Sequence, residues 1–307
     1  MSGRGIALPR ILFWESSDER VAEVASKRDN TFHPVLLRGD GPAPVDVETI
    51  DGGFVEAEWM NRRPGESRLP REGAEIAAAA LALGLVDGAV GGAAHTSEVV
   101  LRAGLRYVGA TGTVSMAMLA TPPDSGLVGR SVMLADCAVV PHPTSLQMAE
   151  IAIASAESWE RATGAKALVA FVASTSKSGA DTPEIQRIQD AISIVRKRCP
   201  ELQVDGELQI DAALSPEVAL RKLGSGGLGG YANVLVFPDL VSANSAYKIL
   251  QHMAGYQIAP ITQCFAKPFF DVSRGCSLSE LRAAALQCAA QAERMLAKQT
   301  REKFDAS

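Results

Sequence analysis

The chain has 307 residues, 47% of them hydrophobic and 21% charged, and its 30 basic and 35 acidic residues leave a net charge of −5. This composition is typical of a folded globular protein and excludes an extensively disordered chain. No basic block of the kind that binds nucleic acid or an anionic membrane occurs, so a functional cation must act singly, in a pocket. The length suits one large domain or two of ordinary size.

Neither the cysteines nor the histidines are spaced as metal ligands. The five cysteines include no CxxC pair, and the four histidines are scattered without an HxxxH pattern. We therefore predict reduced thiols, a cytoplasmic location and no bound metal. The N-terminus lacks the pattern of a signal peptide, and the longest apolar run, 76–86, is about half the roughly 20 residues that a membrane-spanning helix needs.

Short apolar runs alternate with helical patterns along most of the chain. In chain order the predicted elements are a strand over 11–14, a helix within 15–26, a strand over 35–37, a helix over 72–83, a strand over 86–93, a helix within 95–104, a strand over 131–135, a helix over 144–162, a strand over 167–173, a helix over 182–198, a strand over 233–237, and helices over 244–254 and 278–298. Such alternation predicts an α/β fold with largely parallel sheets. Ser16 or Ser17 is expected to cap the first helix, and Gly84 to close the alanine-rich one.

Polar clusters follow several of these strands directly. They are His95–Ser97, Asp136, Ser174–Ser178 and Asp239. Ligands of parallel sheets bind at the carboxyl ends of the strands. Thr96, Ser174 and Ser176 are therefore candidate substrate-binding residues.

The segment Gly224–Gly229, GSGGLG, matches the dinucleotide pattern GxGxxG letter for letter. A dinucleotide fingerprint must follow a strand and open a helix, whereas this segment follows a helical pattern and precedes a strand. We interpret it as a flexible connector, not as a nicotinamide site.

Ser273, Arg274 and Gly275 form the candidate site with the clearest chemistry. A hydroxyl, a fixed cation and a flexible backbone unit just before a helix can receive a phosphate-like anion. Asp271 and Gly275 are further candidates for substrate binding. Alternatively, Arg274 pairs with Asp271 and Gly275 merely permits a turn.

Two neighbours of this triplet have competing interpretations. Ser277-Leu278-Ser279-Glu280 matches a capping box, which would tie the Glu280 carboxylate to a backbone N–H and compete with a catalytic role. Cys276 could be a nucleophile at a helix N-terminus, although a small packing residue is the favoured interpretation.

Several segments together resemble the phosphate acetyltransferase (phosphotransacetylase) family. They include LVDGAVGGAAHTSEVVLRAGLRYVG, DCAVVPHPTSLQMAEIAIASAES, NVLVFPDLVSANSAYK and KPFFDVSRG, in the order in which that family has them. The resemblance covers most of the chain. It implies reversible transfer of an acetyl group between acetyl phosphate and coenzyme A, with phosphate released or taken up.

The same resemblance implies a fold and an assembly. The fold is two α/β domains around an interdomain cleft, akin to isocitrate and isopropylmalate dehydrogenases, with residues 1–117 and 276–307 in one domain and 118–275 in the other. The implied assembly is a homodimer. Coenzyme A and acyl phosphate are the implied substrates, and no permanently bound cofactor, nucleic acid or membrane is implied.

Family matching also assigns roles within the site. Ser273 would donate a hydrogen bond to the transition state, Arg274 would bind the phosphoryl oxygens, and Glu280 stands where the family has an aspartate as general base. Arg102 matches an arginine that helps to hold coenzyme A. The extra methylene of Glu280 lengthens the side chain by about one bond, in a setting where geometry counts to within an ångström.

Other positions depart from the family pattern. Val140 and Phe270 stand where asparagines are usual, Ala259 where a glycine is usual, and Ala103 where proline follows the arginine matched by Arg102. Phe270 is expected to add bulk at the pocket, so a changed acyl preference or a weakened activity is open. The alternatives are a non-catalytic acyl-coenzyme A-binding module of the same fold, and a phosphate butyryltransferase-like enzyme.

Overall fold

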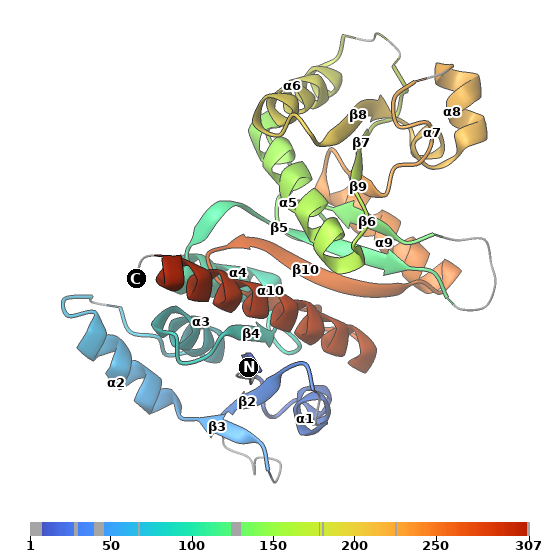
Figure 1. Cartoon of the computed structure of the whole chain (residues 1–307). Helices are drawn as coiled ribbons and strands as arrows, with labels where there is room; N and C mark the ends of the chain where they lie inside the picture. The colour runs from blue at the N-terminus through green and yellow to red at the C-terminus, as the bar shows by residue number, and fades with distance from the viewer. Residues whose placement is uncertain are drawn as a thin grey trace, which may run out of the picture. The chain divides into compact units, whose positions relative to one another are not determined.

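The computed structural model describes residues 8–27, 30–39, 46–66, 68–123, 130–177, 179, 181–224 and 226–305. The chain divides into two compact units, of which unit 1 comprises residues 1–111 and 265–307 and unit 2 comprises 112–264 (Figure 1). The boundaries expected from the sequence lay after residues 117 and 275. They differ because the strand Phe269–Asp271 pairs with a strand of unit 1, whereas Ala110–Thr121 belongs to the sheet of unit 2.

Unit 1 is built on a parallel five-stranded sheet in the order β11-β4-β1-β2-β3. Its strands are β1 Arg10–Phe13, β2 His33–Leu37, β3 Glu48–Ile50, β4 Gly88–Gly91 and β11 Phe269–Asp271. Its helices are α1 Glu19–Ser26, α2 Gly52–Arg62, α3 Gly73–Leu83, α4 Ser97–Ala103, the π-helical turn η1 Gly104–Val108 and α10 Leu278–Asp305.

Close packing in unit 1 depends on small residues. The rings of Trp14 and Phe269 stack with centroids 5.2 Å apart. A Cβ on Gly91 would overlap the indole of Trp14, so this approach requires glycine. Helix α3 buries Ala77–Ala80 completely, and their short side chains leave room for the helix to lie against its neighbours.

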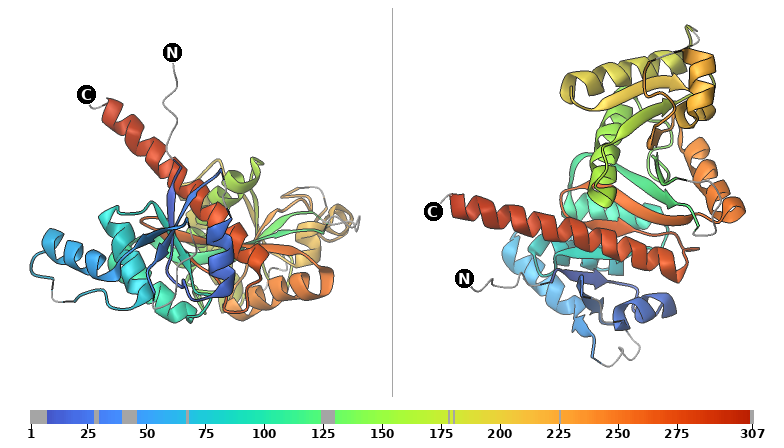
Figure 2. Two further views of the ribbon diagram at one scale, coloured as in Figure 1. Left: turned by 90° about the horizontal axis from the view of Figure 1, so that it is seen from below. Right: turned by 45° about the vertical axis from the view of Figure 1, so that its right-hand side comes forward.

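Helix α10 completes unit 1 from the far end of the chain. It packs against α1, β1, β4 and β11, and Figure 2 shows it in red as one uninterrupted helix. Leu281, Ala284, Ala285 and Cys288 form its buried face.

Unit 2 is built on a mixed six-stranded sheet in the order β10-β5-β6-β9-β7-β8, in which β5 is antiparallel to β6 while β6, β9, β7 and β8 run parallel. The strands are β5 Ala110–Thr121, β6 Val132–Ala135, β7 Leu168–Val172, β8 Gln203–Leu208, β9 Val234–Val236 and β10 Gln257–Phe265. The helices are α5 Ser145–Thr163, α6 Pro183–Arg198, α7 Ile210–Leu214, α8 Pro216–Leu223 and α9 Leu240–Ala254. Helices α5 and α6 lie side by side (Figure 1). The predicted α/β class is confirmed.

The structure corrects some predicted element ends and confirms others. Asp18, not Ser16 or Ser17, caps α1, because its carboxylate accepts a hydrogen bond from the Arg20 N–H. Gly84 ends α3 in the left-handed conformation at φ 73°, as predicted. Gly224 ends α8, and the glycine-rich segment then leads to β9, in the helix-to-strand order expected of a connector; Ser225 lies outside the described residues.

The predicted strand-helix-helix order after residue 233 was incomplete. It missed β10, which contains Pro260 and several polar residues, and β11, which has three residues. Both strands are defined by their pairing partners more than by their own pattern. Within the described residues, no helix is both long enough and apolar enough to cross a membrane.

Candidate active site

Three loops meet at the carboxyl edge of the sheet in unit 1. They follow β1, β4 and β11, which are adjacent parallel strands. The backbone N–H of Val272 donates to the carbonyl of Gly91 at 2.8 Å, so the last two loops stay paired as they leave the sheet. Parallel topology thus places the polar residues after β4 beside the Ser273–Gly275 segment.

Glu15, directly after β1, holds the loop after β4. Its buried carboxylate accepts hydrogen bonds from four successive backbone N–H groups, those of residues 92–95, at 2.7 to 3.1 Å. The Nδ1 atom of His95 lies 2.6 Å from the same carboxylate. A buried carboxylate is stable only with such donors, and here they fix the shape of the loop.

Asp271, the last residue of β11, faces the same loop from the interior. It is 1% exposed, and a Cβ on Gly92 would overlap its carboxylate. Burial is the main cause that raises the pKa of Asp271 to about 7; a hydrogen bond from Ser97 opposes the shift, and the charge of Glu15 adds to it. The structure therefore makes Asp271 an interior support, whereas the sequence had suggested a substrate-binding residue.

The raised pKa of Asp271 predicts a pH-dependent stability. Because the pKa exceeds its ordinary value of 3.8, the folded state binds more protons than the unfolded state between about pH 4 and pH 7. The stabilising contribution is complete below that window and is lost as the pH rises through it, with a slope of at most about 1.4 kcal/mol per pH unit. We expect Asp271→Asn, which imitates the protonated acid, to gain stability relative to the parent protein from pH 5 to pH 8 in urea unfolding. An unchanged difference would contradict this prediction, and the exposed Asp190→Asn serves as control.

The Ser273–Gly275 segment forms an exposed turn. The carbonyl of Ser273 accepts the N–H of Cys276 at 2.9 Å, and the Ser273 hydroxyl oxygen accepts the N–H of Gly275 at 3.2 Å. All three residues of the triplet are exposed. The alternative of an Arg274–Asp271 pair is not realised, because no ion pair among the described residues involves Arg274 and Asp271 is buried.

The start of α10 realises the capping box. Glu280 Oε2 accepts the backbone N–H of Ser277 at 2.7 Å and its hydroxyl at 2.9 Å, while the N–H of Glu280 donates to Ser277 Oγ at 3.2 Å. The capping interpretation is confirmed as a structural role of Glu280. The Glu280 carboxylate therefore lies at the N-terminal end of α10, beside the backbone N–H of the capping residue Ser277.

Cys276 is packed rather than exposed at the helix end. It is 5% exposed, and burial raises the pKa of its thiol to about 11, although the nearby Arg20 charge opposes the shift. A thiol that stays protonated at neutral pH is a poor nucleophile. The favoured interpretation of Cys276 as a packing residue agrees with this environment.

Comparisons with known proteins agree on one family. A profile described as "Phosphate acetyl/butaryl transferase" matches residues 67–289. Among curated relatives, the phosphate acetyltransferase of Clostridium acetobutylicum is 39% identical over 79% of this chain and 75% of its own length. That of Paracoccus denitrificans is 37% identical over 88% of this chain and 91% of its own. The chain belongs to the phosphate acetyl/butaryl transferase family.

Solved structures agree with this assignment. A phosphotransacetylase from Streptococcus pyogenes has a TM-score of 0.82 and 28% identity, with 94% of each chain covered. A phosphotransacetylase from Staphylococcus aureus has a TM-score of 0.81 and 27% identity, over 93% of this chain and 94% of that one. A 4-hydroxythreonine-4-phosphate dehydrogenase from Klebsiella pneumoniae, with a TM-score of 0.50 and 11% identity over 93% of this chain and 99% of that one, shares the fold alone, in keeping with the predicted likeness to dehydrogenases.

Two residues of unit 1 that were predicted to bind substrate, Thr96 and Arg102, lie at the start and near the end of α4. Thr96 is the exposed N-cap of the helix and makes no side-chain capping bond. Arg102 is 64% exposed and pairs with Glu98 one turn earlier. An exposed pair of this type contributes little to stability, so Arg102 can exchange Glu98 for a ligand at small cost.

The two serines predicted to bind substrate, Ser174 and Ser176, belong to unit 2. Ser174 is exposed after β7, whereas the hydroxyl of Ser176 accepts the N–H of Gln209 at 2.9 Å and so has a structural partner. Ser178 lies outside the described residues. Asp136, also singled out from the sequence, is buried and accepts backbone N–H groups from Met116 and from residues 138–140.

The departures from the family pattern lie in different environments. Phe270 is completely buried in β11, where it pairs with Val90, so its bulk lies in the core of unit 1, whereas the sequence had suggested bulk at the pocket. Val140 contributes its backbone N–H to Asp136 at 2.6 Å, a bond that any residue except proline can make. Ala259 is half-buried within β10.

Arg20 and Glu15 are the site residues that sequence reasoning missed. Both lie within ESSDER, directly after the first strand, at the position where ligand-facing residues of parallel sheets gather. That position was the available signal. Their partners in the loops after β4 and β11 lie 73 to 256 residues away in the sequence, so no local pattern could identify these contacts.

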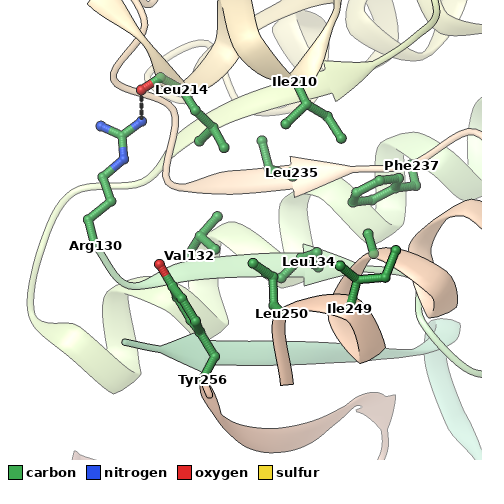
Figure 3. A pocket seen from close by; sticks show the side chains of 11 residues that line it. Arg130, Val132, Leu134, Ile210, Leu214, Leu235, Phe237, Ile249, Leu250 and Tyr256 are labelled. Carbon is green, nitrogen blue, oxygen red and sulfur yellow. Dashed lines mark hydrogen bonds between the residues drawn. The ribbon is translucent and has the colours of Figure 1, made fainter. Parts of the chain in front are cut away.

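Unit 2 contains an apolar cavity of about 480 Å³, shown in Figure 3. Its lining includes Leu134, Phe237 and Ile249, and its charged residue Arg130 donates to the carbonyls of Leu214 and Gly230. Because that guanidinium already has partners, the cavity lacks the convergent polar groups of a catalytic site. Among the residues that the structure describes, no group of three or more histidine, cysteine or acidic side chains is placed to hold a metal ion.

Proposed function

We propose that the chain transfers an acetyl group between acetyl phosphate and coenzyme A, with the chemistry centred on Ser273 and Arg274. The observation that carries this proposal is the Ser273–Gly275 turn. The turn is exposed, and the Arg274 guanidinium has no ion-pair partner among the described residues. The hydroxyl oxygen of Ser273 already accepts the N–H of Gly275. A hydroxyl that accepts one hydrogen bond still has its proton to donate.

The proposed step needs three groups. The coenzyme A sulfur forms a bond to the acetyl carbonyl carbon, and the carbon–oxygen bond to phosphate then breaks, with its electron pair leaving on the phosphate. Ser273 donates to the carbonyl oxygen as it becomes an oxyanion, and Arg274 stabilises the leaving phosphate. Glu280 accepts the proton of the thiol, which is the role that the family resemblance implies.

Substrate binding by Arg102, Thr96 and Ser174 is proposed on weaker support. Arg102 and Thr96 are exposed on α4, which contacts β11 and so lies near the Ser273 segment within unit 1. Coenzyme A is proposed as a co-substrate and not as a resident cofactor. The cytoplasm is the proposed location.

Thioester formation from coenzyme A and acetyl, propionyl or butyryl phosphate tests the proposed function. We expect the acetyl compound to have the highest kcat/KM, and phosphate to appear in equal amount to thioester. Binding of coenzyme A without turnover of any acyl phosphate would support a binding module instead. A preference for butyryl phosphate would support the butyryltransferase-like alternative.

A homodimer is the proposed assembly. Helix α9 carries three exposed apolar residues, Val241, Ile249 and Met253, which follow one another at spacings of eight and four residues. They are 73%, 56% and 83% exposed. An exposed apolar stripe of this kind is typical of an interaction surface. Sedimentation at the mass of two chains would support this assembly, and sedimentation at the mass of one would contradict it.

A further inference from the structure

The guanidinium of Arg20 joins all three loops at the site edge of unit 1. Nη1 donates to the carbonyls of Arg274 at 3.0 Å and Cys276 at 2.7 Å, and Nη2 donates to the carbonyl of Ala93 at 3.0 Å. Asp18 holds the guanidinium from behind, with Oδ1 3.0 Å from Nε and Oδ2 2.7 Å from Nη2. This bidentate pair raises the pKa of Arg20 and lowers that of Asp18, so both groups stay charged.

The two carbonyls on the triplet side are coupled to catalytic groups through rigid peptides. The peptides after Arg274 and Cys276 are trans, so the N–H of each points opposite to its C=O. Drawing the Arg274 carbonyl toward Arg20 aims the Gly275 N–H at Ser273 Oγ, where it donates at 3.2 Å. Drawing the Cys276 carbonyl the same way aims the Ser277 N–H at Glu280 Oε2, where it donates at 2.7 Å.

We propose that Arg20 is a positioning residue, which orients the Ser273 hydroxyl and the Glu280 carboxylate at the same time through these two peptide planes. This inference rests on the proposed function. Glu15 and Arg20 have opposite charges and bind opposite backbone groups. The Glu15 carboxylate accepts from N–H groups of the loop after β4, whereas Arg20 donates to the carbonyl of Ala93 in that loop and to the carbonyls after β11.

Lysine could not replace arginine here. The planar fork of Arg20 donates in several fixed directions, whereas an ammonium group is a compact point charge on a flexible stem. We expect Arg20→Ala to lower kcat roughly 10- to 100-fold, the scale of misplacing reacting groups by about an ångström. Arg20→Lys should recover little of this loss, and added guanidinium ion should recover part of it for Arg20→Ala. The KM for coenzyme A should change much less than kcat.

A double-mutant cycle separates positioning from general damage. If Arg20 acts through Ser273, then Arg20→Ala should cost much less in a Ser273→Ala background than in the parent protein. Full additivity of the two losses would overturn the proposal. Lys27→Ala is the matched control, because Lys27 follows the same helix and pairs with Glu23 in an exposed i,i+4 contact.

A milder variant keeps the proposal testable if Arg20→Ala does not fold. Asp18→Asn retains a good helix cap but weakens the support behind the guanidinium, and we expect a several-fold loss of kcat with an unchanged melting temperature. Parent-like kcat in both Asp18→Asn and Arg20→Ala would refute the positioning role. If these variants are active and Arg274→Ala is not, only this inference fails. If Arg274→Ala is active as well, the proposed function fails.

Discussion

Arg274→Ala is expected to lower kcat with acetyl phosphate and coenzyme A by roughly 10² or more, the scale of losing one preorganised charge-stabilising donor. The physical reason is the negative charge that develops on the departing phosphate. Within the Ser273–Gly275 segment, Arg274 is the one residue with a positive charge that can stabilise it. Because Arg274 is exposed and carries no structural ion pair among the described residues, its truncation should leave stability almost unchanged. Initial rates of thioester formation and a melting curve measure both effects.

The conservative variant and the control sharpen this result. Arg274→Lys keeps the charge but loses the two-pronged geometry, so its kcat should fall between those of the parent and the alanine variant. Arg301→Ala removes an exposed arginine near the C-terminal end of α10, far along the helix from Arg274, and should leave kcat within a factor of two. If Arg274→Ala turns over at the parental rate, Arg274 does not bind the phosphoryl group.

Glu280→Gln is expected to lower kcat by roughly 10² to 10⁴, the usual contribution of a general base. Glutamine preserves an acceptor for the Ser277 N–H, so the capping box survives while the proton acceptor is removed. The melting temperature should therefore stay near that of the parent protein. Glu280→Ala, by contrast, should also lose about 1 kcal/mol of stability through the cap.

The pair of variants separates the two roles of Glu280. Glu280→Asp retains a carboxylate and should lose less kcat than Glu280→Gln, by up to about 100-fold if the shorter side chain misplaces the base by about an ångström. Glu293→Gln, an exposed change on the same helix, is the control. Parental turnover by Glu280→Gln would leave Glu280 as a cap alone and would move the base to another group, with His95 beside Glu15 as the first candidate.

Local sequence signals were sufficient where the structure is decided by neighbours in the chain. The capping box at Ser277 and Glu280, the left-handed end of α3 at Gly84 and the connector after α8 all depend on residues within a few positions. The exposed triplet is local in the same sense, because its two turn bonds span two or three residues.

Local signals failed where partners are distant. The sequence favoured a serine cap for α1, yet Asp18 takes that position and also binds Arg20, whose other contacts reach the end of the chain. Asp271 and Phe270 read as pocket residues, but β11 pairs with β4 and thereby buries both. A three-residue strand has too little pattern of its own to show which neighbour will cover it.

The sequence by itself determined the alternating α/β pattern, the position of Ser273 and Arg274 before the last helix, and the family. Only the tertiary structure decided that the β1–α1 segment supports this site, through Glu15 on one loop and Arg20 on two. The reason is physical: a charge that is buried, as in Glu15, or half-buried, as in Arg20, must be satisfied by whichever backbone groups the fold brings to it. The parallel order β11-β4-β1, and no local sequence pattern, brings those groups together.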